Sequence, residues 1–396
     1  MPVVSLLAGA SVRLFGMGLF QARLVPLALA SVVLLLTYLV GRRLFSAHAG
    51  LVAATALAVF PPFLDLSRVV RYDIGVPVFG LAAWLALEKR PFVAGLFAGL
   101  AALCHVYGAA WLVVLALLKP RDAVRVAAGF GAALLPWAVY IATGWNDFVL
   151  QNWNARDRIQ LTSPGFYASN VWNEIHRYAP LRKAALLAPW IWVGGAAAGV
   201  AILLRERRRE LVVPLVTLAG LFALLLSPKT FGYLATVWPL AALALAVALV
   251  RLPNGLLAAS LLALAADGLV LSRRPREATS AKELATLMAS HLPRGSRVLA
   301  LQDYWLDLAR AFPDYRSLHA AIDLATPSYS PSPPALAAAM DAYPFDVLLL
   351  DQKMLDFLAQ SPPHPMAIEL RAYLVPFRRV DAFRDPTYGR FEVLAR

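Results

Sequence analysis

Long apolar stretches dominate the first two thirds of the chain, and short polar or basic segments separate them. A helix that crosses a bilayer needs about 17–25 mostly apolar residues. By that measure the pattern predicts roughly ten spanning helices, at residues 22–40, 48–64, 74–88, 91–105, 106–119, 123–143, 186–204, 211–227, 231–250 and 254–271. Residues 3–16 are apolar but interrupted by glycine, and we expect a helix there at the membrane surface. The pattern is typical of a polytopic α-helical membrane protein.

The pattern changes after residue 272, where apolar runs become short. Helical spacing and strand-like alternation then follow each other, separated by turn-forming residues. The predicted elements are a helix at 281–290 and strands at 297–301, 346–350, 377–383 and 391–394. We therefore expect a transmembrane domain at 1–272, with a long outer loop at 144–185, and a small soluble α/β domain at 273–396. The tail has no phosphate-binding glycine loop or nucleophile elbow, so we expect it to pack against other parts or to guide an acceptor.

Composition excludes the main alternatives to a membrane protein. The 396 residues are 60% hydrophobic and 15% charged, with a mean hydropathy of +0.63, whereas soluble domains are about 45–50% apolar. The single cysteine, Cys104, excludes an internal disulfide and a cysteine metal cluster. The net charge of +13 does not indicate a nucleic-acid partner, because much of the basic excess lies in short loops between apolar runs.

The placement of charge predicts the topology. All the basic loops fall on one side if residues 91–119 form a hairpin that turns near His105–Gly108. That side then carries Arg42, Arg43, Lys89, Arg90, Lys119, Arg121, Arg125, Arg205, Arg207, Arg208, Arg209 and Arg251. Because positive loops stay inside, this side is expected to be cytoplasmic. The loop at 144–185 and the tail would then be extracytoplasmic, and the protein integral to the plasma (inner) membrane.

The sharpest candidate site is the segment from Ser67 to Asp73, between the second and third predicted spans. Arg68 and Arg71 are three residues apart and would share a face of a helical turn. Two guanidinium groups beside the Asp73 carboxylate suit a phosphate ester and a hydroxyl to be activated. The alternative is structural: an ion pair fixes the loop, and Asp73 caps the next helix.

The outer loop at 144–185 is rich in aromatic residues and carries further polar candidates. Asn170, Glu174 and Tyr178 recur every four residues and would line one helical face. This face could overhang the site and contact sugar or phosphate, or belong to an interfacial helix with an aromatic belt. The candidate binding residues of this loop are Arg156, Arg158, Glu174 and His176.

Three more candidates lie in other outer loops. His105 and Tyr107 occupy the predicted turn between the fourth and fifth spans. A single histidine beside apolar residues is more often structural than catalytic, and no second histidine lies at a metal-ligand spacing, so zinc is not expected. Lys229 could hold a lipid phosphate or reach the interface with its charged end.

The N-terminal third resembles the polyprenyl-phosphate-dependent glycosyltransferases of the GT-C fold, which include protein O-mannosyltransferases and lipid A aminoarabinose transferases. The resemblance is specific over about residues 6–120 and architectural beyond them. It is carried by Phe15-Gly16, Ala22-Arg23-Leu24, Leu36-Thr37-Tyr38, Gly41-Arg42-Arg43-Leu44-Phe45, Ala49-Gly50-Leu51, Phe60-Pro61, Ser67-Arg68 and Arg71-Tyr72-Asp73.

The resemblance implies an inverting membrane transferase. Such an enzyme takes a sugar from a polyprenyl-phosphate carrier on the extracytoplasmic face and passes it to a hydroxyl of a lipid, protein or polysaccharide. Asp73 would be the general base, and Arg68 and Arg71 would stabilise the departing polyprenyl phosphate. No cofactor is expected, because the lipid-linked sugar is itself the donor; a divalent-metal requirement is left open.

The sequence departs from the family pattern at its start. The family begins with an extra span and a first outer loop that carries its principal catalytic acid, whereas Met1 aligns just after that loop. We expect that the natural start lies upstream. A degenerate, non-catalytic paralogue, such as a partner of a lipid-linked-sugar flippase, is the main alternative. A secondary transporter is disfavoured because no inverted repeat is visible.

Overall fold

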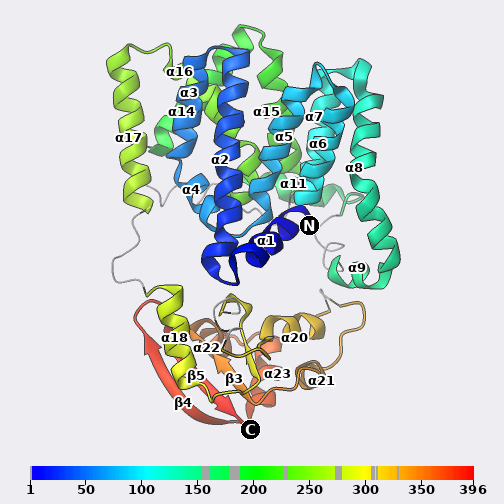
Figure 1. Ribbon diagram of the computed structural model, residues 1–396, viewed down its shortest axis with the longest axis vertical. Coiled ribbons are helices and arrows are strands. Elements are labelled where there is room, and N and C mark those ends of the chain that lie inside the picture. The colour runs from blue at the N-terminus through cyan, green and yellow to red at the C-terminus, as the bar shows by residue number, and fades with distance from the viewer. Residues whose placement is uncertain are drawn as a thin grey trace. The chain divides into compact units, whose positions relative to one another are not determined.

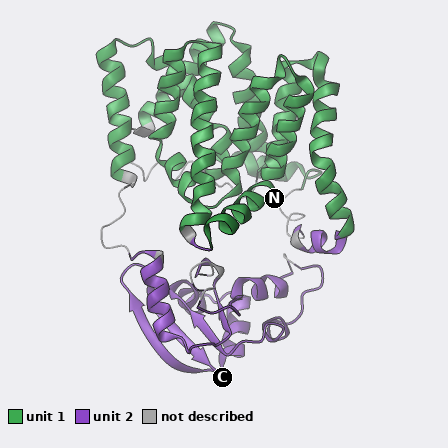
Figure 2. Ribbon diagram, viewed as in Figure 1, with its two compact units in different colours: residues 1–16, 20–143, 158–273 green, residues 17–19, 144–157, 274–396 purple. Residues whose placement is uncertain are grey.

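The structure, a computed structural model, describes residues 2–152, 160–177, 188–226, 231–272, 279–304, 308, 311–327 and 330–396. The chain divides into two compact units, coloured separately in Figure 2. The first holds Met1–Gly16, Phe20–Thr143 and Arg158–Arg273, and the second holds Met17–Leu19, Gly144–Asp157 and Arg274–Arg396. Each unit is described by itself below.

The first unit is a bundle of helices (Figure 1). Its α-helices are α1 (Pro2–Phe15), α2 (Leu19–Leu44), α3 (Ala47–Ala58), α4 (Pro61–Arg68), α5 (Gly75–Leu87), α6 (Pro91–Cys104), α7 (Ala110–Leu118), α8 (Ala123–Thr143), α11 (Pro164–Trp172), α12 (Glu174–Arg177), α14 (Ala188–Arg205), α15 (Arg209–Leu225), α16 (Trp238–Leu249) and α17 (Asn254–Ser272). Its 3-10 helices are η1 (Tyr72–Ile74), η2 (Val106–Ala109), η3 (Pro120–Asp122) and η4 (Phe231–Thr236). The hairpin predicted from the charge pattern is confirmed: α6 and α7 pack together and η2 forms the turn.

The predicted ten spans are not confirmed as ten full-length helices. Within the described residues, Phe20–Leu44 and Pro120–Thr143 are long and apolar enough to cross a membrane, and several further apolar helices have 10–17 residues. The span predicted at 48–64 is divided into α3 and α4, which meet at an angle of 66°. Phe60 is extended at the break and Pro61 follows it; a proline disfavours helical backbone in the residue before it.

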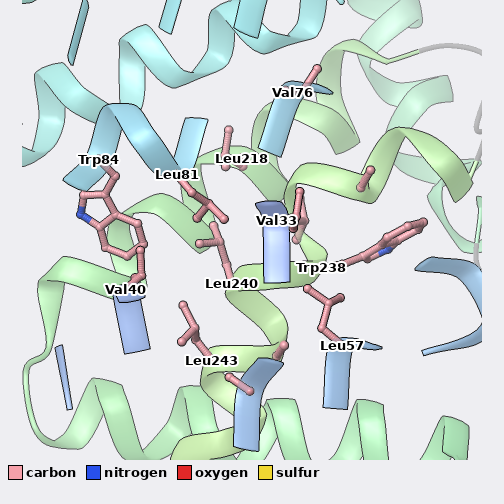
Figure 3. Close-up of a cluster of buried hydrophobic side chains, with 14 of the residues drawn as sticks. Val33, Val40, Leu57, Val76, Leu81, Trp84, Leu218, Trp238, Leu240 and Leu243 are labelled. Carbon is pink, nitrogen blue, oxygen red and sulfur yellow. The ribbon is translucent and has the colours of Figure 1, made fainter. Parts of the chain in front are cut away.

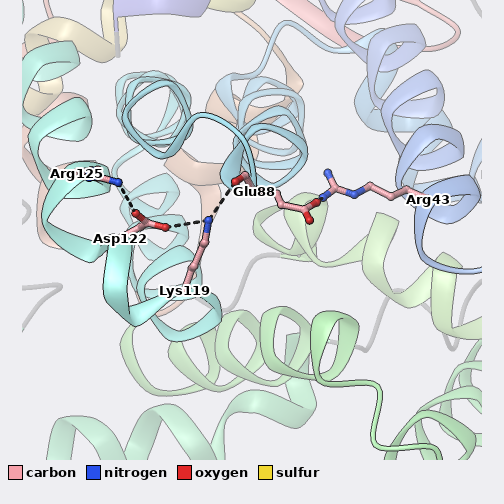
Figure 4. A network of polar contacts seen from close by, with 5 residues as sticks. All are labelled: Arg43, Glu88, Lys119, Asp122 and Arg125. Atoms are coloured by element: carbon pink, nitrogen blue, oxygen red, sulfur yellow. Dashed lines mark hydrogen bonds and ion pairs between the residues drawn. The ribbon is translucent and has the colours of Figure 1, made fainter.

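The basic turns gather at one end of the bundle, which we call the basic end (Figure 1). There Arg43 pairs with Glu88, and the Lys119 ammonium donates to the Glu88 carbonyl at 3.1 Å. Lys119 also pairs with Asp122 at 2.9 Å, and Arg125 lies 3.1 Å from the same carboxylate (Figure 4). This chain of contacts ties together the turns that follow α2, α5 and α7.

The apolar core of the first unit is centred on α16. Ten of its twelve residues are buried, so the helix is enclosed by protein on all sides. Figure 3 shows its Trp238, Leu240 and Leu243 among side chains from α2, α3, α5 and α15. By contrast, only 11% of the apolar window of Pro120–Thr143 is buried, so most of α8 presents apolar side chains outward, as a lipid-facing helix does.

The α6–α8 contact depends on glycine. A Cβ at Gly95 of α6 would lie 2.0 Å from the Val126 carbonyl oxygen, and a Cβ at Gly129 of α8 would lie 2.0 Å from the Phe92 carbonyl oxygen. The two backbones therefore touch in both directions, which is the packing that small residues allow in membrane helices.

The second unit contains a five-stranded sheet in the order β2-β1-β3-β5-β4. β1 pairs in parallel with β2 and β3, whereas β5 is antiparallel to β3 and β4. Its elements are α9 (Trp145–Asn152), α18 (Ala281–His291), β1 (Val298–Ala300), η5 (Gln302–Tyr304), β2 (Arg316–Ser317), α20 (Leu318–Ala325), α21 (Leu336–Asp341), β3 (Val347–Leu350), α22 (Gln352–Ala359), α23 (Pro365–Leu374), β4 (Arg378–Asp385) and β5 (Gly389–Ala395). The helix and four strands predicted in the tail overlap α18, β1, β3, β4 and β5, and the two-residue β2 was missed.

Polar side-chain contacts, two of which follow, tie segments of the second unit together. Arg297 lies 2.7 Å from the Asp346 carboxylate before β3 and holds the pKa of that carboxyl below its ordinary value of 3.8. His291 of α18 lies 2.8 Å from the carboxylate of Asp381 on β4, and this hydrogen bond likewise lowers the pKa of Asp381.

Candidate functional site

A buried carboxylate lies at the end of the bundle opposite the basic end, in the short connection between α4 and α5. The connection is extended at Val69 and Arg71 and then turns into η1. It brings the side chains of Arg71 and Asp73 together, two residues apart, and leaves Asp73 only 2% exposed. The predicted shared face of Arg68 and Arg71 is wrong, because α4 ends at Arg68 and the backbone beyond it is not helical.

Both oxygens of the Asp73 carboxylate accept a hydrogen bond. The Arg71 Nε donates to one at 2.7 Å, and the Tyr107 hydroxyl donates to the other at 2.8 Å. Tyr107 comes from η2, 34 residues along the chain, and is buried. Because a buried charge is costly without partners, these two donors explain how Asp73 can lie inside the bundle.

Three rings lie beside the ion pair of Arg71 and Asp73. The rings of His105 and Tyr107 lie 4.2 Å apart between centroids, and Tyr233 of η4 lies 5.4 Å from His105 and 5.6 Å from Tyr107. The Nδ1 atom of His105 is buried and has no hydrogen-bond partner among the residues that the structure describes. A buried polar atom without a partner is costly and is often found at functional sites. His105 therefore has an unused hydrogen-bonding atom beside the carboxylate.

Arg71 is the accessible member of the group. Its side chain is 38% exposed, whereas that of Asp73 is 3% exposed. The guanidinium carbon lies 5.9 Å from the centroid of the Tyr233 ring, within the range of a cation–π contact. Of the three guanidinium nitrogens of Arg71, only Nε makes a hydrogen bond to a residue that the structure describes. The two terminal nitrogens form a fork of donors, which is the geometry that binds a phosphate with two hydrogen bonds.

Contacts with α7 and α16 fix the position of the η4 helix. The Trp111 indole of α7 donates to the Thr236 hydroxyl at 2.9 Å, and both side chains are fully buried. On its other side Phe231 packs against Trp238, with 5.4 Å between ring centroids. The position of Tyr233 beneath the guanidinium is therefore set by a packed element.

An apolar hollow of about 770 Å³ opens between α11, α12 and α15. It is lined by Tyr167, Ala168, Val171, Trp172, His176 and Leu224. Two residues before Leu224 on α15, Phe222 packs against Tyr107 with 5.1 Å between ring centroids. The same helix end thus contributes to the hollow and to the packing around Asp73.

The other predicted residues do not join the Asp73 group. Arg68 is exposed, and Glu174 is half-buried at the start of α12. His176 is exposed and lines the hollow. The predicted continuous face is interrupted, because α11 ends at Trp172 and Asn170 donates to the Leu224 carbonyl at 2.9 Å. The remaining candidates lie outside the described residues: Arg156, Arg158, Tyr178 and Lys229.

Comparison with known families decides the identity. Residues 2–228 match glycosyltransferase family 87. The chain belongs to this family. Its fold is that of the GT-C glycosyltransferases. The crystal structure of ArnT from Cupriavidus metallidurans bound to undecaprenyl phosphate is similar, with a TM-score of 0.60, 15% identity, and coverage of 99% of this chain and 87% of that chain. The apo oligosaccharyltransferase from Archaeoglobus fulgidus gives a TM-score of 0.51 at 13% identity and covers 92% of this chain and 64% of that chain. None of the curated proteins matches.

The sequence analysis singled out Arg71, Asp73, His105 and Tyr107, which the structure brings together, and their role in function stays a prediction. It did not select Tyr233, whose signal was an aromatic residue in a short loop. In the part of the chain that the structure describes, no three His, Cys, Asp or Glu side chains come close enough to hold a metal ion.

Proposed function

We propose that this family 87 protein transfers a sugar from a polyprenyl-phosphate carrier to an acceptor hydroxyl on the extracytoplasmic side of the membrane. The observation that carries the proposal is the Arg71 guanidinium, whose Nε atom is held by a buried carboxylate while the side chain as a whole stays 38% exposed. The site lies opposite the basic end, which the positive-inside rule assigns to the cytoplasm.

The charge change of the reaction explains why an arginine is useful there. The acceptor oxygen forms a bond to the anomeric carbon, and the bond from that carbon to the phosphate oxygen breaks. Its electron pair stays on the phosphate, which changes from a singly charged diester to a more highly charged monoester, and the acceptor proton passes to a base. A fixed guanidinium stabilises this added charge more strongly than it stabilises the donor, so it lowers the barrier. A single displacement of this kind inverts the anomeric configuration.

The apolar hollow suits the isoprenoid part of such a donor. Its lining is mainly aliphatic and aromatic, and α15 connects it to the ring packing around Asp73. Solved structures of the same fold include ArnT bound to undecaprenyl phosphate. This supports the choice of a long-chain lipid phosphate as the first compound to test.

The test is binding of undecaprenyl phosphate to the full chain in lipid nanodiscs, measured by native mass spectrometry or by a thermal shift. Arg71→Ala should weaken binding by about tenfold or more, the amount expected for a lost charge-assisted contact. Arg68→Ala is a matched control, because Arg68 is exposed and makes no hydrogen bond to the Asp73 group. Equal losses in both variants, or none in either, would refute the assignment.

Transfer itself requires a second experiment. Lipids and surface glycans are compared by mass spectrometry between cells with and without the gene. In cells without the gene, one lipid-phosphate sugar should accumulate and one glycosylated acceptor should disappear. These two compounds identify the donor and the acceptor together. Unchanged profiles of both would contradict a role in glycosyl transfer.

A further inference from the structure

We propose that Asp73 and Tyr107 are positioning residues that hold Arg71 toward the donor phosphate, and that Asp73 does not serve as the general base. This inference rests on the proposed function, because it assigns roles within the same site. It replaces the sequence-based prediction in which Asp73 takes the proton of the acceptor hydroxyl.

Accessibility is the first argument. A general base must come within about 2.6–3.2 Å of the proton that it removes. The Asp73 side chain is 3% exposed, and both of its oxygens already accept a hydrogen bond. Each oxygen keeps a second lone pair, but an acceptor hydroxyl could approach it only if the side chains that bury the carboxylate moved aside. The base for transfer is therefore a different group.

The orientation of the guanidinium is the second argument. Asp73 engages the Nε atom, and the Tyr233 ring lies near the guanidinium carbon. These contacts restrain the group at its Nε edge and beside the Tyr233 ring, and they leave the terminal fork without a hydrogen bond to any residue that the structure describes. Preorganised donors contribute more to catalysis than donors that must be ordered at the moment of reaction. A lysine at this position could not make the same contacts, since it lacks both the Nε donor and the fork.

Tyr107 completes the arrangement. Its hydroxyl satisfies the carboxylate oxygen that Arg71 leaves unused. The Tyr107 ring is held by His105 and by Phe222, with centroid distances of 4.2 and 5.1 Å. The carboxylate thus has one donor buried in the bundle, Tyr107, and one donor that is partly exposed, Arg71. Tyr107 therefore fixes the Asp73 carboxylate, and Asp73 in turn fixes Arg71.

The test compares the direction in which the affinity for undecaprenyl phosphate changes when Asp73 or Tyr107 is substituted. Undecaprenyl phosphate binding needs no base, so it isolates positioning from proton transfer. If Asp73 were only a base, Asp73→Asn would leave this binding unchanged or strengthen it, because a negative charge near the phosphate disappears. If Asp73 positions Arg71, the same change should weaken binding by about fivefold or more. Tyr107→Phe, which keeps the ring packing, should weaken it in the same direction.

A double-mutant cycle closes the argument. Asp73→Asn in the Arg71→Ala background should cause no further loss, because residues that act through one another are not additive. Each variant is compared at matched size-exclusion profile and melting temperature, so that misfolding is recognised. Unchanged or tighter binding in both Asp73→Asn and Tyr107→Phe overturns this inference. Failure of the proposed function would give a different result. In that case the Arg71→Ala single variant would bind undecaprenyl phosphate as tightly as the unaltered protein.

Discussion

The contact between α6 and α8 makes a quantitative prediction about two glycines on the same helix. A Cβ at Gly129 would lie 2.0 Å from the Phe92 carbonyl oxygen, whereas a Cβ at Gly131 would have nothing within 4 Å. Both positions lie in α8, so both gain about 1 kcal/mol of helix propensity when changed to alanine. Only the first change forces two backbones apart.

The clash has a defined size. Ordinary carbon–oxygen contacts are near 3.3 Å or longer, so the helices must separate by more than about 1 Å at this point. Overpacking of this kind typically costs about 1–3 kcal/mol. Since the propensity gain is common to both variants, the difference between Gly129→Ala and Gly131→Ala isolates the clash. It should equal about 1–3 kcal/mol in favour of Gly131→Ala.

The assay is thermal unfolding of the detergent-solubilised full chain at one fixed heating rate. A difference of 1–3 kcal/mol corresponds to a separation of about 1–4 °C for a chain of this size, with Gly129→Ala the lower. Gly95→Ala should resemble Gly129→Ala, because its Cβ would lie 2.0 Å from the Val126 carbonyl oxygen. Equal melting temperatures for Gly129→Ala and Gly131→Ala would show that α6 and α8 are not packed backbone to backbone.

Three other predictions concern stability and the basic end. Thr236→Val leaves the buried Trp111 indole N–H without its acceptor and should cost about 1–3 kcal/mol of unfolding free energy; an unchanged melting temperature would argue against this hydrogen bond. Because Arg297 lowers the pKa of Asp346 below 3.8, the pair stabilises the fold above that value, and this stabilisation is lost as the pH falls through the lowered pKa. The protection factors of the β1 and β3 amides, which correct for the intrinsic pH dependence of exchange, should therefore fall below about pH 4, and less steeply in Asp346→Asn; identical profiles of the unaltered protein and the variant would contradict it. Arg43→Ala removes an exposed pair at the basic end and should change stability by less than about 1 kcal/mol and leave undecaprenyl phosphate binding unaffected.

The sequence predicted the fold wherever one physical signal dominated. The α6–α7 hairpin followed from charge, since only a turn near His105 placed every basic loop on one side, and the structure has that turn. The break between α3 and α4 was missed, although Pro61 and Pro62 mark it, because hydropathy alone does not detect a change of direction. The strand β2 was missed because its two residues, Arg316 and Ser317, are too few to show an alternating pattern.

The site was predicted less completely, because it depends on contacts that are distant in sequence. Proximity in sequence was enough to associate Arg71 with Asp73. It could not show that the Tyr107 hydroxyl reaches the same carboxylate from 34 residues away. Arg68 was included on the assumption that a helix continued through Arg71, and that assumption failed at the C-terminal end of α4. The contribution of Tyr233 depends on the packing of η4, which no local pattern reveals.

The geometry of the Asp73 group follows from close backbone approaches made possible by glycine. A Cβ at Gly75, directly after η1, would lie 2.7 Å from the Cys104 sulfur, so a larger residue there would require the Cys104 side chain or α5 to shift. A Cβ at Gly108 would lie 2.2 Å from the Ala101 carbonyl oxygen, so η2 can fold back against α6 only with glycine there. Together these two contacts bring η1 and η2 close enough for the Tyr107 hydroxyl to reach the carboxylate. The polar group is therefore fixed by the backbone packing of the bundle, and a side chain added at either glycine should disturb the placement of Arg71 without touching it.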